Sequence, residues 1–73
     1  MSNPTDIDWL EQSAENDDKY AMNSLAHLYK FGSGTEKNLE KAFDWYQKAA
    51  ERDHISAQYN LAYSYYNGER ASI

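Results

Sequence analysis

The chain has 73 residues, a net charge of −5 and no cysteine. This length allows one domain, whose small core gives only marginal stability. Without cysteine the chain can form neither a disulfide nor a thiolate metal site, which fits a reducing compartment. We therefore expect a single domain over residues 1–73, with 1–5 and 69–73 as flexible ends.

The charge is concentrated at the N-terminus. Residues 1–18 contain six acidic residues and no Lys or Arg, whereas the remainder is close to neutral. Direct nucleic-acid binding is disfavoured, because phosphate affinity needs a basic surface. No apolar run has the length of a signal peptide or a membrane span, which predicts a cytoplasmic protein without membrane contact. The acidic end is interpreted as a solvated helix face, or alternatively as a patch for a basic partner.

Two helices are predicted in the first half of the chain. The first covers about 6–16, because Pro4 precedes it and early acidic residues suit the positive end of a helix dipole. The second covers about 18–31, and its apolar residues follow the i, i+3, i+4, i+7 spacing of one face: Met22, Leu25, Ala26 and Tyr29. Gly32-Ser33-Gly34 ends it, since glycine takes the left-handed conformation that terminates helices.

Two more helices are predicted in the second half. The third covers about 39–52, with Asn38 as N-cap. Its inward stripe consists of Ala42, Trp45, Tyr46, Ala49 and Ala50. The fourth covers about 55–66 and ends at Asn67-Gly68. Its expected inward face consists of Gln58, Leu61, Ala62 and Tyr65.

The two halves repeat each other with a period of 36 residues. When 8–32 is aligned with 44–68, ten of the 25 positions are identical, among them Trp9/Trp45, Ala14/Ala50, Asp17/Asp53, Leu25/Leu61, Ala26/Ala62 and Tyr29/Tyr65. A period of this length at helical spacing indicates a stacked array of helix pairs. Alanines allow close helix approach, and Trp9, Trp45, Tyr29 and Tyr65 should fill the gaps beside them. The predicted fold is all-α, a right-handed α-solenoid of four antiparallel helices.

Three motifs within the repeat are specific. Residues 21–29 match the pattern A-x-x-x-L-G-x-x-Y, Gly32-Ser33-Gly34 matches G-x-G, and residues 41–50 match K-A-x-x-W-Y-x-K-A-A. In these motifs the chain resembles the Sel-one-like repeat family, relatives of tetratricopeptide repeats. Ala26 and Ala62 stand where the family usually has Gly, and so do Asp17 and Asp53 between helices. Asp tolerates the left-handed conformation better than most residues. The resemblance implies one full repeat between two half repeats, in a protein that binds other proteins.

No catalytic, cofactor or metal site is predicted. Neither His27 nor His54 lies in a metal-ligand spacing such as H-E-x-x-H. Glu51, Asp53 and His54 could bind a metal weakly, but a polar turn is the preferred interpretation because metal sites need several convergent ligands. Ser24 and His27 share a helix without an oxyanion donor or a nucleophile turn. We therefore expect a protein that is not an enzyme and has no cofactor.

The fourth helix carries a stripe of aromatic residues outside its expected inward face, Tyr59, Tyr63 and Tyr66, at i, i+4, i+7 spacing. The 36-residue offset relates them to Asn23, His27 and Lys30 on the second helix. The resemblance to tetratricopeptide arrays implies that both stripes line one concave groove. These six residues are the predicted partner-binding site, because tyrosine is typical of binding hot spots. The alternative is that some tyrosines are half-buried helix cover.

The predicted function is a non-enzymatic module that binds another protein stoichiometrically, such as a small inhibitor, an immunity-type protein or an adaptor. The alternatives are a self-assembling structural unit, or an acidic decoy that blocks a nucleic-acid-binding protein. The fourth helix has no helix after it, so part of its apolar surface should be uncovered. A second copy could cover this surface, which gives a homodimer through the C-terminal helix. A target protein could also cover it. Otherwise Tyr63, Tyr66 and Ile73 fold back to cap the end.

Overall fold

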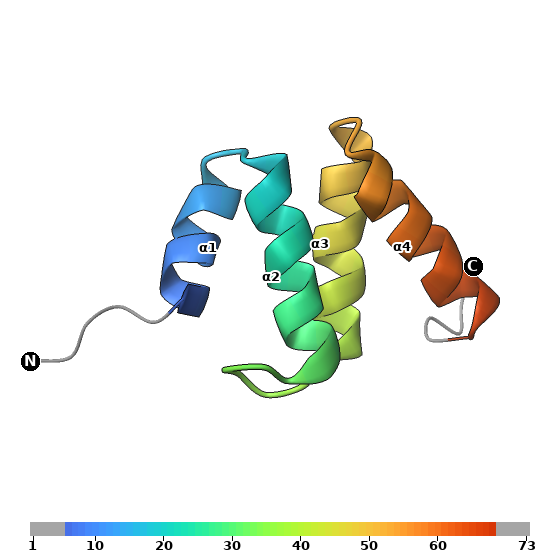
Figure 1. Ribbon diagram of the computed structural model, residues 1–73, viewed down its shortest axis with the longest axis horizontal. Helices are drawn as coiled ribbons and strands as arrows, with labels where there is room; N and C mark the ends of the chain where they lie inside the picture. The colour runs from blue at the N-terminus through green and yellow to red at the C-terminus, as the bar shows by residue number, and fades with distance from the viewer. Residues whose placement is uncertain (1–5, 69–73) are drawn as a thin grey trace, which may run out of the picture.

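The computed structural model describes residues 6–68 and shows four helices that run antiparallel in a row (Figure 1). They are α1 (Asp6–Glu15), α2 (Lys19–Phe31), α3 (Leu39–Glu51) and α4 (Ile55–Tyr66). Each neighbouring pair in the chain packs together, and the contact of α2 with α3 is the most extensive. Within residues 6–68 there is no strand, so the all-α prediction and the helix bounds are confirmed to within a residue.

Local side chains define where the helices begin and end. The Asp18 carboxylate accepts hydrogen bonds from the backbone N–H groups of Tyr20 and Ala21, which caps α2. Asn38 caps α3 in the predicted way, by accepting from the N–H of Lys41 at 3.0 Å. Gly32 ends α2 in the left-handed conformation, with φ 68°, and a Cβ there would lie 3.2 Å from the Cβ of Lys37.

The two short turns between helices each contain an aspartate in the left-handed conformation. Asp17, between α1 and α2, has φ 75°, and Asp53, between α3 and α4, has φ 62°. In each turn the next N–H reaches back to close the preceding helix, from Asp18 to Ser13 at 3.0 Å and from His54 to Ala49 at 3.2 Å. The expectation that aspartate adopts the left-handed conformation here is therefore confirmed at both positions.

The core runs along the row and contains most of the predicted small residues. Its buried members are Ala14, Ala21, Met22, Leu25, Ala26, Tyr29, Ala42, Tyr46, Ala49 and Ala57. Alanine at the contacts lets the helices approach closely, while Met22, Leu25 and Tyr46 fill the space between them. Phe43, which was not predicted to be inward, is also buried and meets the Tyr65 ring edge-to-face at 5.0 Å.

Two core predictions are wrong, one at each end of the row. Trp9 on α1 is 58% exposed, whereas its repeat equivalent Trp45 packs partly buried against the core. On α4, Gln58 and Ala62 are exposed, and Leu61 and Tyr65 are only partly buried. The cause is the same at both ends, because α1 and α4 each have a neighbouring helix on one side only.

The proposed fold-back of the C-terminal end does not use the α4 tyrosines. Tyr63 is 50% exposed and Tyr66 is 88% exposed, so neither covers the open face of its own helix. Ile73, the third residue of that prediction, lies outside the described residues. The uncovered apolar surface on α4 is therefore a property of the folded chain over residues 6–68.

Candidate protein-binding groove

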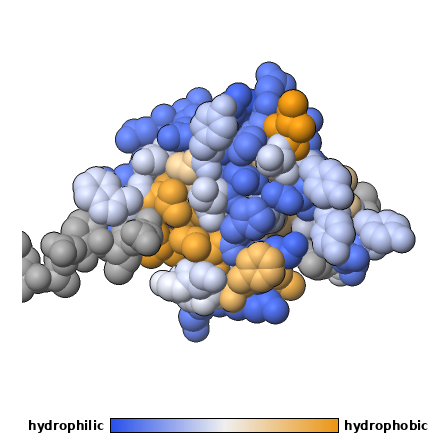
Figure 2. Space-filling view, in the orientation of Figure 1, coloured by the Kyte–Doolittle hydropathy of each residue, from blue (hydrophilic) through white to orange (hydrophobic). Residues whose placement is uncertain are grey.

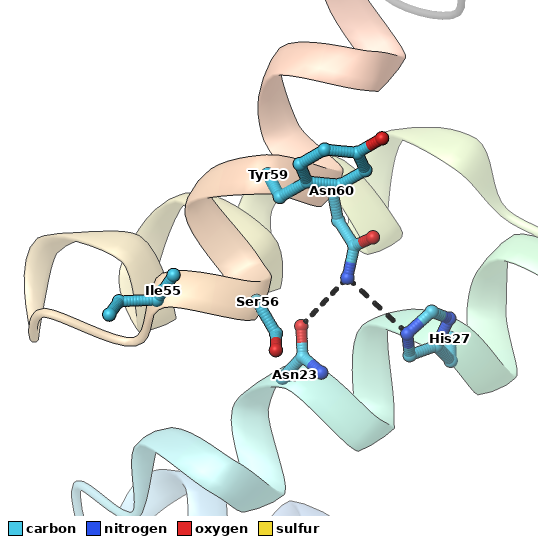
Figure 3. A pocket seen from close by; sticks show the side chains of 6 residues that line it. All are labelled: Asn23, His27, Ile55, Ser56, Tyr59 and Asn60. Atoms are coloured by element: carbon cyan, nitrogen blue, oxygen red, sulfur yellow. Dashed lines mark hydrogen bonds between the residues drawn. The ribbon is translucent and has the colours of Figure 1, made fainter.

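A groove of about 490 Å³ lies between α2 and α4. It is lined from α2 by Asn23 and His27, and from α4 by Ile55, Ser56, Tyr59 and Asn60 (Figure 3). The two helices are separated in sequence by all of α3, which packs against both of them. The predicted juxtaposition of the α2 and α4 stripes is therefore present, and the 36-residue repeat produces it by placing equivalent helices on the same side of the array.

Hydrogen bonds organise the floor of this groove. The Asn60 side-chain amide donates to Asn23 Oδ1 at 3.2 Å and lies 3.4 Å from His27 Nε2 (Figure 3). On the other side of the imidazole, the Tyr46 hydroxyl lies 2.9 Å from His27 Nδ1. His27 thus joins α2 to both α3 and α4. Because Tyr46 is buried, this connection anchors the groove floor in the core.

The electrostatics of the floor favour a neutral imidazole. Burial, and secondarily the positive charge of Lys30, lower the pKa of His27 below its ordinary value of 6.5. A neutral imidazole has one donor and one acceptor nitrogen, which suits its two neighbours, Tyr46 and Asn60. The His27 and Tyr46 rings also meet edge-to-face at 5.3 Å. The neutral form is therefore the one that this network holds together.

Further along the groove, a lysine and aromatic rings from both helices come together. Lys30 Nζ lies 5.3 Å from the centroid of the Tyr63 ring on α4 and 5.5 Å from that of Phe31 on α2. Figure 2 shows aromatic rings projecting from the surface on the α4 side of the molecule. Tyr59 is 71% exposed, so it and Tyr66 are not half-buried helix cover. Tyr63 is half exposed, and its ring contacts Lys30 of α2.

The structure gathers most of the six predicted site residues. Asn23, His27 and Tyr59 line the groove, and Lys30 meets Tyr63 at its end. Tyr66 is exposed on the last turn of α4 and does not line this groove. The prediction missed three lining residues, Ile55, Ser56 and Asn60. A helical wheel would have found them, because these positions and Tyr59 and Tyr63 form one broad face of α4.

The geometry at Ser24 and His27 does not resemble a catalytic pair. Both ring nitrogens of His27 have neighbours other than Ser24, namely Tyr46 and Asn60. Among residues 6–68, no group of three His, Asp or Glu side chains converges as a metal site would require. In the same part of the chain, no helix is long and apolar enough to cross a membrane.

Two of the acidic residues near the N-terminus have roles inside the fold. Asp17 forms an ion pair with Arg52, which connects the α1–α2 turn to the end of α3. Burial raises the pKa of the Tyr29 phenol, and the charge of nearby Glu11 and its hydrogen bond with the phenol raise that pKa further. These acidic residues are therefore part of the contact between neighbouring helices and do not form only a solvated face.

Comparison with known proteins agrees with the repeat geometry. A model of the Sel1 repeat matches residues 7–18, 19–54 and 55–72, which together cover most of the chain. The three segments correspond to α1, to α2 with α3, and to α4, so the middle segment is the full repeat. Neither the curated proteins nor the solved structures include a significant match. The repeated helix pairs and the matching segments show that this chain belongs to the Sel1 repeat family.

Proposed function

We propose that this protein is a stoichiometric protein-binding module whose groove between α2 and α4 holds a peptide segment or a helix of its partner. Sel1 repeats generally mediate protein–protein interactions, which supports a binding role. The observation that carries the proposal is the exposed Tyr59 beside an ordered polar floor of Asn23, His27 and Asn60. Through such binding the protein would act as an inhibitor, an immunity-type protein or an adaptor.

The chemistry of the groove suits protein recognition. Tyr59 and Tyr63 offer large contact area with a hydrogen-bonding tip and lose little conformational entropy on binding. The α4 segment Ile55–Tyr66 contains no charged residue. A partner that docks there therefore does not have to desolvate an ionised side chain of that helix. The Asn23 amide nitrogen, as a donor, and Asn60 Oδ1, as an acceptor, can pair with a partner's backbone. Aromatic anchors around polar groups are typical of interface hot spots.

The test is a double variant, Tyr59→Ala with Tyr63→Ala, used to capture partners from extracts of the native host. Both side chains are at least half exposed and alanine favours helix, so the fold should persist, as circular dichroism and thermal melting will show. Capture of the partner should be lost. Trp9→Ala is the matched control, because it removes an exposed aromatic side chain from α1, outside the groove, and should leave capture unchanged.

Two results would contradict the proposal that the partner binds in the groove. Capture that survives the double variant would mean that the partner binds elsewhere. Capture that falls steeply with added salt, and with the combined substitutions Asp6→Asn, Asp8→Asn and Glu11→Gln, would identify α1 as the contact. In that case the acidic decoy, which acts on a basic partner, becomes the better description of the protein.

A further inference from the structure

We propose that the uncovered face of α4 binds the uncovered face of α1 in a second copy of the chain, so that copies join head to tail. The two faces lie on the terminal helices of the row, at its opposite ends (Figure 1). The uncovered face of α1 presents the apolar side chain of Trp9. The uncovered face of α4 presents Ala62 and the partly buried Leu61. One copy cannot bring these two faces together, whereas a second copy can.

The contact between α2 and α3 is the internal template for this association. Beside Ala21, α2 buries Met22, Leu25, Ala26 and Tyr29. The 36-residue offset gives α4 the equivalent set Gln58, Leu61, Ala62 and Tyr65, three of which are identical. Helix α2 lies between α1 and α3, and its contact with α3 is the more extensive. An α4 face that carries the same residues can therefore accept a helix of the α3 type.

Helix α1 corresponds to α3 in the repeat. Its Trp9 is equivalent to Trp45, which packs against the core and lines one hollow together with Ala14 and Met22 from the preceding helices. Trp9 is 58% exposed because no preceding helix covers it within residues 6–68. Leu10 and Ser13 stand where α3 has Tyr46 and Ala49, so the face keeps its apolar and small character. Docked on α4, Trp9 would gain the environment that Trp45 already has.

The packing inside the chain favours the head-to-tail pairing over a symmetric one. The extensive helix contacts among residues 6–68 are α1 with α2, α2 with α3 and α3 with α4. Each of them joins a helix of the α1 and α3 type to a helix of the α2 and α4 type. A pairing of two α1 faces, or of two α4 faces, has no counterpart among these contacts. Unlike faces in contact leave a free face at each end, so association continues beyond the dimer unless the row closes into a ring.

The test is sedimentation of the full chain from roughly 10 µM to 1 mM, because a contact of one helix pair is small and such interfaces are weak. The average mass of the unaltered chain should rise past that of a dimer. Trp9→Glu and Ala62→Glu each block one face at an exposed side chain, so each variant alone should remain monomeric. An equal mixture of the two retains one intact pair of faces and should form a 1:1 dimer and nothing larger.

Each other outcome overturns the proposal. A monomeric unaltered chain at 1 mM removes the association altogether. Association of Trp9→Glu alone, with loss in Ala62→Glu, would show symmetric pairing through α4. A monomeric mixture would show that the two faces do not recognise each other. Circular dichroism establishes that both variants fold, and since neither residue lines the groove, partner capture through Tyr59 is measured independently.

Discussion

Helices α2 and α4 occupy the same place in the repeat but differ in how much they bury. Helix α2 buries Ala21, Met22, Leu25, Ala26 and Tyr29, whereas α4 buries only Ala57 and Ser64. Leu25 and Ala26 are fully buried. Of the identical residues on α4, Leu61 is partly buried and Ala62 is exposed. The reason is that α2 lies between α1 and α3, whereas α4 packs extensively against α3 and meets α2 only through side chains at the groove, within residues 6–68. An apolar stripe therefore defines a face, but the neighbouring helix decides whether that face is buried.

The groove depends on the positions at which these two helices differ. Asn23 and His27 on α2 correspond to Tyr59 and Tyr63 on α4, and side chains from both helices meet above α3. Identical positions thus build the array, and differing positions supply the surface chemistry. Substitutions at equivalent residues of the two copies therefore test this contrast.

Leucine truncation should separate the two helices most clearly. Leu25→Ala removes a fully buried side chain and should lower the free energy of unfolding by about 3 kcal/mol, a cost typical of core cavities. Leu61→Ala removes a partly exposed side chain and should cost about 1 kcal/mol. Urea unfolding measures both values. Equal losses would mean that the open face of α4 is covered in solution.

Enlargement of the paired alanines tests the same contrast from the opposite direction. Ala26→Leu forces extra volume into the contact of α2 with its neighbours and should destabilise the fold by about 2 kcal/mol. Ala62→Leu adds the same volume at an exposed position and should change stability by less than about 0.5 kcal/mol. Thermal melting at low protein concentration checks the pair. A clear loss for Ala62→Leu contradicts the exposure of this position.

The helix N-caps differ between the repeats and can be exchanged. Asp18 and His54 have nearly the same backbone angles, but only Asp18 accepts hydrogen bonds from the first turn of its helix. His54→Asp should therefore stabilise the fold by about 0.5–1 kcal/mol, and Asp18→Ala should cost about 1 kcal/mol. Urea midpoints report both. No gain from His54→Asp would indicate that the contact of His54 with the Tyr20 ring contributes as much as a cap.

The two left-handed aspartates should respond unequally to glycine. Asp53→Gly removes backbone strain at φ 62° and should stabilise the fold by about 0.5 kcal/mol. Asp17→Gly gives the same relief but also removes the ion pair with Arg52, so its net gain should be smaller. A larger gain at Asp17 would show that this ion pair adds no stability.

The smallest expected effect is the pH dependence of stability through His27, because its ring is only partly buried. Since the pKa of His27 is lower in the folded chain than its ordinary 6.5, the unfolded chain takes up the proton first as the pH falls. The contribution of neutral His27 to the free energy of unfolding is complete above pH 6.5 and is lost as the pH drops through the pKa of the folded state. The urea concentration at the unfolding midpoint, measured between pH 5 and 8, should decrease toward pH 5. The variant His27→Gln should show a smaller decrease.

Local sequence signals were enough to predict the local structure. Helical periodicity, Asn38 and Gly32 predicted where helices begin and end, and the left-handed preference of aspartate predicted Asp17 and Asp53. These features are decided by residues close together in the chain, so the chain pattern contains them. The resemblance to tetratricopeptide arrays implied that the stripes of α2 and α4 lie side by side, and residues of both helices line the groove. The right-handed sense of the array stays a prediction.

Which helix faces have a neighbour becomes clear from the packed array. Trp9 and Trp45 are identical in the repeat alignment, but the first is exposed and the second packs on the core. The network of His27, Asn60 and Tyr46 joins three helices, and no spacing along the chain encodes such a meeting. Burial and hydrogen bonding depend on what lies across a contact, whereas periodicity describes one helix at a time. That physical difference separates what the repeat alone predicts from what the packed array shows.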